Sequence, residues 1–248
     1  MIVFINGGRG MQRYFAKEYT KNKLILQDSD VHHIKKVMRM RVGDTIEVVH
    51  NNKLHICSIK ELEPLDLLVT NVIEEENKLN LDIIIAIGLV KEQKMDLILQ
   101  KLTELGVSRI IPVSMERSIV KLEKDRFNKK KVRWEAICKE ASEQSKRTNI
   151  PIIEDIKSIK DLINMEADYK LVASTKEKGK KFNCYLQNIN SYAKIIMVIG
   201  PEGGISEKEE SLLNANGFDS VSFGNLIFRV ETAAIYAASI FNFYSSMR

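Results

Sequence analysis

Val198-Ile199-Gly200-Pro201-Glu202-Gly203-Gly204-Ile205-Ser206 is the stretch of this chain that decides its fold. The apolar run that leads into it, Ile195 to Ile199, predicts a strand buried on both faces. The glycines let the backbone turn sharply or approach a ligand closely, and Ser206 with Glu209 forms a capping box that starts a helix. Because open α/β sheets bind ligands at the carboxyl ends of their strands, the stretch predicts a ligand-binding loop. The alternative is a plain tight turn between strand and helix.

Strands and helices alternate on both sides of this loop. A helical apolar stripe, made of Met95, Ile98, Leu99, Leu102 and Leu105, follows the first buried strand. The expected strands are residues 81–87, 109–113, 169–174, 194–199 and 220–223, and the expected long helices are 127–147 and 231–244. This order predicts an α/β domain with a mostly parallel sheet over residues 81–248. Its first strand-to-helix turn lacks a GxGxxG motif, which disfavours an ordinary dinucleotide site.

Residues 11–80 have a different pattern, with short β-rich segments at 23–26, 45–49, 54–59 and 67–73. Turn residues lie between several of them, as in Val42-Gly43-Asp44. One helix is expected to start at Asp28-Ser29-Asp30, which are good N-cap residues, and to carry Val31, Ile34, Val37 and Met38. Several short strands with one helix predict a small β-barrel domain.

Residues 1–10 differ from the rest of the chain. A natural-looking start occurs at Met11, and Gly7-Gly8-Arg9-Gly10 is what a purine-rich ribosome-binding site would encode if it were translated in frame. We therefore expect residues 1–10 to be a mis-started or disordered leader. The mass of the protein from its native source would test this expectation.

Composition restricts the class of protein. The net charge of the 248 residues is only +5, but residues 121–147 contain ten Lys or Arg against five Asp or Glu. That excess of positive charge would attract a polyanion such as RNA, although a solvated helix face explains it equally well. Three scattered cysteines and four histidines without ligand spacing predict neither a disulfide framework nor a metal site. No apolar run is long enough to span a membrane, so a cytoplasmic protein without a membrane partner is expected.

A second informative stretch is Phe223-Gly224-Asn225-Leu226-Ile227-Phe228-Arg229-Val230-Glu231-Thr232-Ala233-Ala234. A strand and a glycine turn precede an irregular apolar segment, and a helix starts near Glu231. Small residues such as Ala233, Ala234 and Ala237 would let that helix pack closely. Arg229 and Glu231 are two apart, and a surface ion pair of little energetic weight would explain them without any function.

The two stretches together resemble the signature of SPOUT methyltransferases, and more narrowly the family that methylates N3 of a uridine in small-subunit ribosomal RNA (the RsmE family). The resemblance extends from Met11 to the C-terminus. Its further motifs are Gln12-Arg13-Tyr14-Phe15, residues 33–44, Lys101-Leu102-Thr103-Glu104-Leu105-Gly106-Val107, Arg117-Ser118 and Glu143-Gln144-Ser145-Lys146-Arg147. This sequence departs from the family at three positions, where Leu226 replaces an Arg, Val230 a Thr and Lys146 a Gly. The departure at Leu226 leaves Arg229 as the only guanidinium in its loop.

The resemblance implies a PUA-like β-barrel that docks RNA, followed by a domain with a deep trefoil knot, which is a rare topology. Three loops would bind S-adenosylmethionine, and members of the family are homodimers. The implied cofactor-binding residues are Ala173, Ser174, Thr175, Gly200, Pro201, Glu202, Gly203, Gly204, Phe223, Gly224, Asn225, Leu226, Ile227, Arg229, Thr232 and Ala233.

The reaction implied by the resemblance sets the catalytic candidates. Uridine N3 must lose a proton while its ring becomes anionic, so Arg229 would stabilise the anion. Glu202 or Glu231 would accept the proton. Arginine binds phosphates bidentately and stacks on bases, which favours an RNA-binding set. That set is Arg13, Tyr14, His33, Arg39, Arg41, Arg117, Gln144 and Arg147. For Tyr14 a place in the barrel core, and for His33 a plain surface position, are the alternatives.

Two other functions stay open at this point. The first is that the same knot acts on another RNA atom, such as a ribose 2′-oxygen or guanosine N1, although the N-terminal barrel tells against this. The second is a ribosome-assembly factor that has lost catalysis, which the departure at Leu226 makes conceivable. The substrate is either free small-subunit ribosomal RNA or the assembled subunit. A kinase or GTPase is excluded because no GxxxxGK[ST] motif is present.

Overall fold

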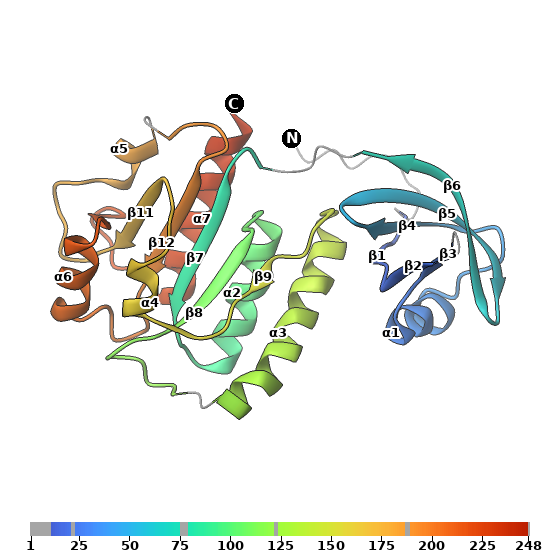
Figure 1. The fold of residues 1–248 in the computed structure, drawn as a ribbon, viewed down its shortest axis with the longest axis horizontal. Helices are drawn as coiled ribbons and strands as arrows, with labels where there is room; N and C mark the ends of the chain where they lie inside the picture. The colour runs from blue at the N-terminus through green and yellow to red at the C-terminus, as the bar shows by residue number, and fades with distance from the viewer. Residues whose placement is uncertain (1–10, 21–22, 75–78, 122–123, 187–188, 248) are drawn as a thin grey trace. The chain divides into compact units, whose positions relative to one another are not determined.

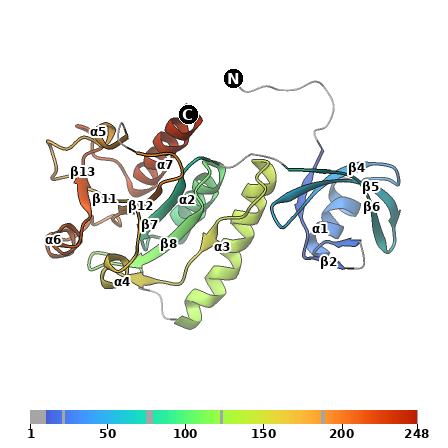
Figure 2. The same cartoon turned by 45° about the horizontal axis from the view of Figure 1, so that its top comes forward.

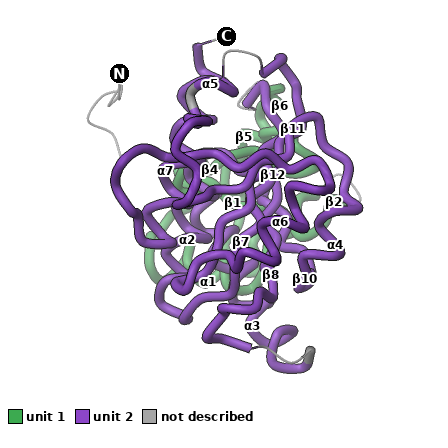
Figure 3. Tube along the Cα trace, turned by 90° about the vertical axis from the view of Figure 1, so that its left-hand side faces the viewer, with its two compact units in different colours: residues 1–77, 143–149 green, residues 78–142, 150–248 purple. Residues whose placement is uncertain are grey.

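The computed structural model describes residues 11–20, 23–74, 79–121, 124–186 and 189–247 (Figure 1). The leader predicted for residues 1–10 lies outside them. The chain forms two compact units, one of residues 1–77 with 143–149 and the other of 78–142 with 150–248 (Figure 3). The sequence interpretation had placed Glu143–Asn149 in the second domain, whereas this segment packs with the first unit.

The first unit is built on a four-stranded sheet in the order β1-β4-β5-β6, next to a separate β2-β3 hairpin. β1 pairs with β4 in parallel and the other neighbours are antiparallel. Side chains from both sheets and from the helical segment share one core, including Tyr14, Leu24, Ile34 and Val48. The elements are β1 Arg13–Phe15, β2 Glu18–Thr20, β3 Lys23–Ile25, α1 Asp28–His32, the π-helix η1 His33–Val37, β4 Thr45–His50, β5 Lys53–Leu62 and β6 Leu65–Ile73.

The helical segment of this unit begins at Asp28, as predicted, but Asp28 is not its N-cap. Gln27 is the N-cap of α1 and makes no side-chain capping bond, so Asp28 and Asp30 lie inside the first turn. Carboxylates there still favour the helix, because they face its positive end. The segment continues as a π-helix, in which Ile34 is buried and Val37 is exposed.

The second unit contains one parallel sheet in the order β10-β8-β7-β12-β11-β13, with β9 beside β8. All its pairings are parallel, as the sequence predicts. The strands are β7 Asp82–Gly88, β8 Arg109–Ser114, β9 Ile152–Ile153, β10 Lys157–Ser158, β11 Tyr169–Ala173, β12 Lys194–Ile199 and β13 Asp219–Val221. The helices are α2 Glu92–Glu104, α3 Lys124–Gln144, α4 Ile159–Ile163, α5 Phe182–Leu186, α6 Glu207–Ala215 and α7 Val230–Ser246.

Helices cover both faces of this sheet, as expected of parallel strands. Ile83, Ile85 and Ile87 of β7 face a core shared with α2, α3 and α7, while Ile84 and Ala86 face a second core under α4 and α6. Figures 1 and 2 show α2 and α7 lying together on one face of the sheet. The alanines predicted to allow close packing of α7 are buried there.

The helix α3 starts and ends three residues before the predicted bounds of 127–147. Its early end has a local cause, because Lys146 adopts a φ of +59°, in the left-handed region that suits glycine. Lys146 is therefore a position at which a glycine would be favoured. The trefoil knot implied by that resemblance stays a prediction. Among the described residues, no helix has the length and apolar character needed to cross a membrane.

Candidate functional site

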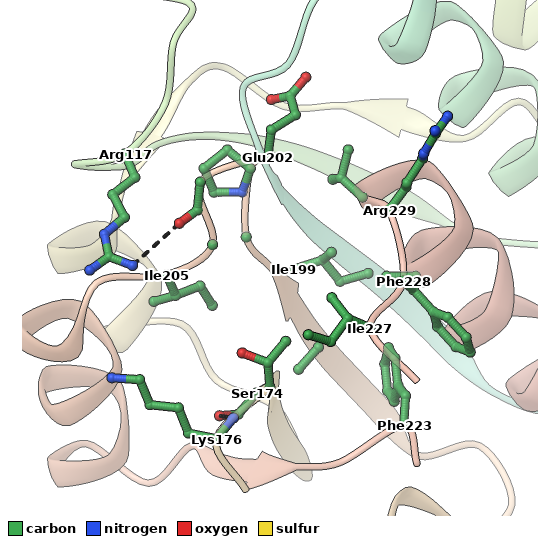
Figure 4. A pocket seen from close by; sticks show the side chains of 18 of the residues that line it. Arg117, Ser174, Lys176, Ile199, Glu202, Ile205, Phe223, Ile227, Phe228 and Arg229 are labelled. Carbon is green, nitrogen blue, oxygen red and sulfur yellow. Dashed lines mark hydrogen bonds between the residues drawn. The ribbon is translucent and has the colours of Figure 1, made fainter. Parts of the chain in front are cut away.

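Three loops meet at the carboxyl edge of the parallel sheet in the second unit. They follow β11, β12 and β13, which are neighbours in the order β12-β11-β13. The loops line a cavity of about 540 Å³ (Figure 4), within the size range of small-molecule sites. The first sequence stretch is therefore more than a turn, since it forms one wall of a cavity.

The loop after β12 is held tightly in shape. The N–H of Gly204 donates to the carbonyl of Pro201 at 2.8 Å, and Gly204 has a φ of +71°, which a residue with a side chain rarely adopts. The predicted capping box is present, with Ser206 and Glu209 bonded reciprocally. The Glu209 carboxylate also accepts from the N–H of Glu116 at 2.8 Å. The start of α6 is thereby tied to the segment that follows β8.

Arg117 forms part of the cavity wall. Its Nη1 donates to the carbonyl of Gly203 at 3.3 Å (Figure 4). A Cβ on Gly203 would lie only 2.9 Å from the Cβ of Arg117, so glycine is what allows this close contact. Arg117 was predicted as an RNA contact, and the structure places it in the lining of this cavity.

The other two loops are held by different contacts. Ser174, after β11, is buried, and its Oγ accepts from the N–H groups of Lys176 and Glu177. After β13, Phe223 and Phe228 pack on Tyr236 of α7 with ring centroids 5.3 and 5.1 Å apart. Aromatic pairs at such distances stabilise beyond their burial. The apolar segment predicted to be irregular is thus fastened to α7.

A cluster of charged side chains lies at one side of the cavity. Lys94 Nζ of α2 lies 3.1 Å from Oε1 of Glu202 and 3.9 Å from Oε2 of Glu231. Burial opposes ionisation of Glu202, but hydrogen bonds from its own backbone N–H, from Lys94 and from the backbone of Lys91 outweigh it and lower its pKa. Glu202 is therefore a carboxylate at neutral pH. Glu231 pairs with Lys94, so the surface ion pair considered for Arg229 is wrong.

The cavity lining includes every predicted cofactor residue except Thr232, which is exposed on α7. Glu231 also lies outside the lining, whereas Glu202 and Arg229 are part of it. Arg229 is exposed at the N-cap position of α7. In Figure 4 the Arg229 and Glu202 side chains both point away from Ser174 and Lys176. The two candidates for proton and charge chemistry thus lie on one side of the cavity.

Some lining residues were missed by sequence reasoning. Four of them lie within the two quoted stretches but were not in the predicted cofactor set, and they are Ile199, Ile205, Phe228 and Val230. Lys176 directly follows the predicted Thr175, and Glu210 lies in the helix after the first stretch. Lys94 follows β7, which is the parallel neighbour of β12. Parallel neighbours end at the same edge of a sheet. The pairing of β7 with β12 therefore indicates that residues after β7, such as Lys94, lie near the loop after β12.

Two residues predicted to bind RNA are parts of the first unit's interior. Arg13 is 3% exposed, its Nε donates to the Glu47 carboxylate at 2.8 Å, and its Nη1 donates to the carbonyls of Lys146 and Arg147. Tyr14 is 2% exposed and its hydroxyl lies 3.0 Å from Nδ1 of His33. Burial, with the charges of Glu143 and Asp30, raises the pKa of the Tyr14 phenol. Both side chains are buried and bonded within the first unit, which supports the core alternative for Tyr14, and an RNA contact through either residue stays an untested prediction.

The remaining residues of the predicted RNA-binding set divide by exposure. Arg39, Arg41 and Gln144 are exposed on the first unit. His33 is partly exposed, whereas Arg147 is only 8% exposed and donates to the side-chain amide oxygen of Asn149. Arg39, Arg41 and Gln144 therefore keep their predicted role as candidates, and Arg147 is mainly a structural residue here.

The basic stretch of α3 is partly neutralised. Lys130 and Arg133 pair with Glu92 of α2 at 3.0 and 2.6 Å, and Arg133 also pairs with Asp96. Lys131 pairs with Asp155. These exposed pairs contribute little stability, but they reduce the local excess of positive charge. Among the described residues, no group of three His, Cys, Asp or Glu side chains is placed to hold a metal ion.

Comparisons with known proteins agree with this geometry. Residues 77–242 match an RNA methyltransferase domain family, and residues 26–70 match an RNA methyltransferase PUA domain family. The chain is 33% identical to ribosomal RNA small subunit methyltransferase E of Bacillus subtilis (strain 168), over 96% of this chain and 98% of that protein. It is 32% identical to the protein of the same name from Aquifex aeolicus (strain VF5), over 93% and 98%.

A solved structure resembles the chain over nearly its whole length. It is a ribosomal RNA small subunit methyltransferase E from Neisseria gonorrhoeae bound to S-adenosyl methionine. The TM-score is 0.82 at 30% sequence identity, and the match covers 93% of this chain and 96% of that one.

Proposed function

This chain belongs to the ribosomal RNA small subunit methyltransferase E family, and we propose that it transfers a methyl group from S-adenosylmethionine to N3 of a uridine in small-subunit ribosomal RNA. The coarser activity, S-adenosylmethionine-dependent methylation of ribosomal RNA, follows from the family. The observation that carries the proposal is the single cavity formed by the loops after β11, β12 and β13. We further propose that the enzyme works as a cytoplasmic homodimer on RNA or on the assembled small subunit.

The lining residues suit this cofactor. Ile199, Phe223, Ile227 and Phe228 provide apolar surface for the adenine, and the glycine-rich loop after β12 offers backbone groups to its polar parts. The residues that would hold it are those of the three loops, from Ala173 to Thr175, from Gly200 to Gly204 and from Phe223 to Ala233. When bound, the cofactor supplies an electrophilic methyl group on a sulfonium.

The chain's own residues then act on the uridine. N3 must give up its proton before it attacks the methyl carbon, and stabilisation of the resulting uracil anion makes that proton easier for a carboxylate to accept. Glu202 is ionised and lines the cavity, which makes it a better acceptor than Glu231. Arg229 would stabilise the negative charge that spreads onto the uracil oxygens. Once Glu202 holds the N3 proton, the nitrogen–methyl bond would form as the methyl–sulfur bond breaks.

The test is methyl transfer in vitro. The purified protein is incubated with labelled S-adenosylmethionine and with small ribosomal subunits that lack their modifications, and the RNA is digested to nucleosides for mass spectrometry. Label in 3-methyluridine is the expected result. Label in another nucleoside would refute the N3 assignment while keeping the methyltransferase. No label despite measurable cofactor binding would favour a ribosome-assembly factor and direct attention to Leu226.

A glycine outside the three loops provides a prediction for the cofactor site. In Gly88→Ala, the new Cβ would lie 2.5 Å from Cδ and 2.6 Å from the backbone N of Pro201, so the loop after β12 must shift. We expect a loss of stability of about 1–3 kcal/mol and at least a tenfold weaker affinity for S-adenosylmethionine, which is about 1.4 kcal/mol. Calorimetry and thermal unfolding measure both. Gly179→Ala is the control, because its Cβ meets only the Glu177 side chain at 3.4 Å. Unchanged affinity in Gly88→Ala would mean that this contact does not shape the site.

A further inference from the structure

Lys94 connects two parts of the site that come from different elements. It lies in the first turn of α2, and its ammonium reaches Glu202 in the loop after β12 and Glu231 in the first turn of α7. Farther along the same two helices, Nδ2 of Asn242 donates to the carbonyl of Leu105 at 3.2 Å. α2 and α7 therefore run side by side with their N-terminal ends together, and Lys94 is the bridge at the end that borders the cavity.

Two carboxylates lie close to Lys94, and its ammonium pairs with both of them. Glu202 and Glu231 are both partly buried, with side chains 21% and 15% exposed. Oε2 of Glu231 is buried and has no hydrogen-bond partner in the described structure. Two carboxylates that share a site repel each other unless a cation lies between them. The other ionisable side chains that line the cavity are Arg117, Lys176, Glu210 and Arg229, and the backbone of Lys91 donates to the Glu202 carboxylate.

We propose that Lys94 is a positioning residue for the methyl transfer, which holds the Glu202 carboxylate at the cavity by compensating the charge of Glu231. This inference rests on the proposed function, because Glu202 is placed there as the acceptor of the uridine proton. Glu231 has a supporting role and fixes the ammonium from the side of α7. Without Lys94, Glu202 would be pushed away from Glu231 or would become protonated, and either change removes the acceptor from its working position.

The competing explanation is that Lys94 binds an RNA phosphate. Its side chain is 33% exposed, so part of the ammonium is accessible. However, the contacts recorded for Lys94 Nζ are with carboxylates, and one of these carboxylates is also stabilised by Lys94 in its ionised form. A phosphate-binding lysine would act mainly on RNA affinity and would depend strongly on salt. The two roles therefore predict different kinetics.

The test is a set of four variants of the full-length protein. Lys94→Met should lower kcat about ten- to a hundredfold, because a displaced catalytic group costs rate rather than binding, while KM for RNA changes little. Lys94→Arg should recover activity to within about fivefold of wild type, since it keeps the charge. Lys101→Met is the matched control, because Lys101 lies on the same helix and forms an exposed pair with Glu104. It should stay within about twofold of wild type.

The decisive variant is Lys94→Met combined with Glu231→Gln. Removing the second carboxylate abolishes the repulsion, so the double variant should be about tenfold faster than Lys94→Met alone, as a coupled pair requires. Equal or lower activity of the double variant would overturn the proposal. A salt-dependent rise in KM for RNA with unchanged kcat in Lys94→Met would overturn it in favour of a phosphate contact.

A second readout separates this inference from the proposed function. Carbon NMR of labelled glutamate carboxyls follows the pKa of Glu202 in each variant without any substrate. We expect that pKa to rise in Lys94→Met and to fall back when Glu231→Gln is added. If the wild type does not methylate uridine N3 but the NMR cycle behaves as described, the proposed function fails and the positioning contact stands. An unchanged pKa of Glu202 in Lys94→Met would refute the positioning contact itself.

Discussion

Replacing Arg13 with methionine is expected to lower the free energy of unfolding of the first unit by about 3 kcal/mol, because it leaves a partly buried carboxylate with one cation fewer. The Arg13 side chain is 1% exposed and that of Glu47 is 12% exposed. Lys146 Nζ stays 2.9 Å from the same Glu47 oxygen, which keeps the loss at the lower end of the usual range. Chemical denaturation measures the change, and hydrogen exchange in β1 and β4 locates it.

The Arg13 effect should depend on pH. Burial opposes ionisation of Glu47, but hydrogen bonds from Arg13 and Lys146 outweigh it and lower its pKa in the folded state. A lowered pKa stabilises the fold above the unfolded-state pKa, and this contribution is lost as the pH falls through the folded-state value. The difference between wild type and Arg13→Met should therefore be larger at pH 7 than at pH 3.

Lys23→Met is the control for Arg13→Met in the same unit. Lys23 forms an exposed pair with Asp66, with the lysine side chain 64% exposed, so its loss should cost less than about 1 kcal/mol. If Arg13→Met were as stable as wild type but bound RNA more weakly, Arg13 would be the RNA contact that the sequence suggested. The buried geometry predicts the opposite pattern.

Replacing Arg229 with methionine is expected to reduce kcat for methyl transfer about 10²–10³-fold, the usual cost of removing one group that stabilises a developing anion. The side chain lines the cavity from the N-cap position of α7, and the N-cap function itself is served by backbone. Affinity for S-adenosylmethionine and thermal stability should change little for that reason. Single-turnover kinetics with labelled cofactor separate the chemical step from binding.

Arg126→Met provides the control for Arg229→Met, because it removes an exposed guanidinium from α3. It should keep kcat within about twofold, since surface charges of this kind contribute little. Loss of cofactor affinity in Arg229→Met, with kcat unchanged, would reassign Arg229 to cofactor binding. Leu226→Arg would then be the next variant to make, since that position carries an arginine in the family as the sequence resemblance describes it.

Most of the fold was predictable because it depends on local patterns. β12 has the bounds that its apolar run predicts, and the stripe from Met95 to Leu102 is buried on α2. The Ser206 capping box starts α6 as its spacing requires. The predicted end of α3 was wrong because Lys146 has a positive φ, which an α-helix does not allow.

The candidate site was predictable in its loops but not in all of its charges. The sequence predicted two of the loops, Gly200 to Gly204 and Phe223 to Ala233. Small residues directly after a buried strand indicate a turn or a ligand-binding loop without any knowledge of distant residues. Lys94 was not identified, because nothing near it in the sequence distinguishes it from other surface lysines. Its role comes from the parallel pairing of β7 with β12, which brings residues more than a hundred positions apart together.

The sequence by itself determined the alternation of strands and helices, the family and the two loops, because periodicity, glycine placement and capping are properties of neighbouring residues. Only the tertiary structure decided which arginines are exposed and which are buried. Arg13 and Arg229 look alike as isolated cations, yet one lies beside Glu47 in the interior and the other borders a cavity. The physical reason is that a side chain's charge is local, whereas its burial and its partners depend on distant segments that packing brings beside it.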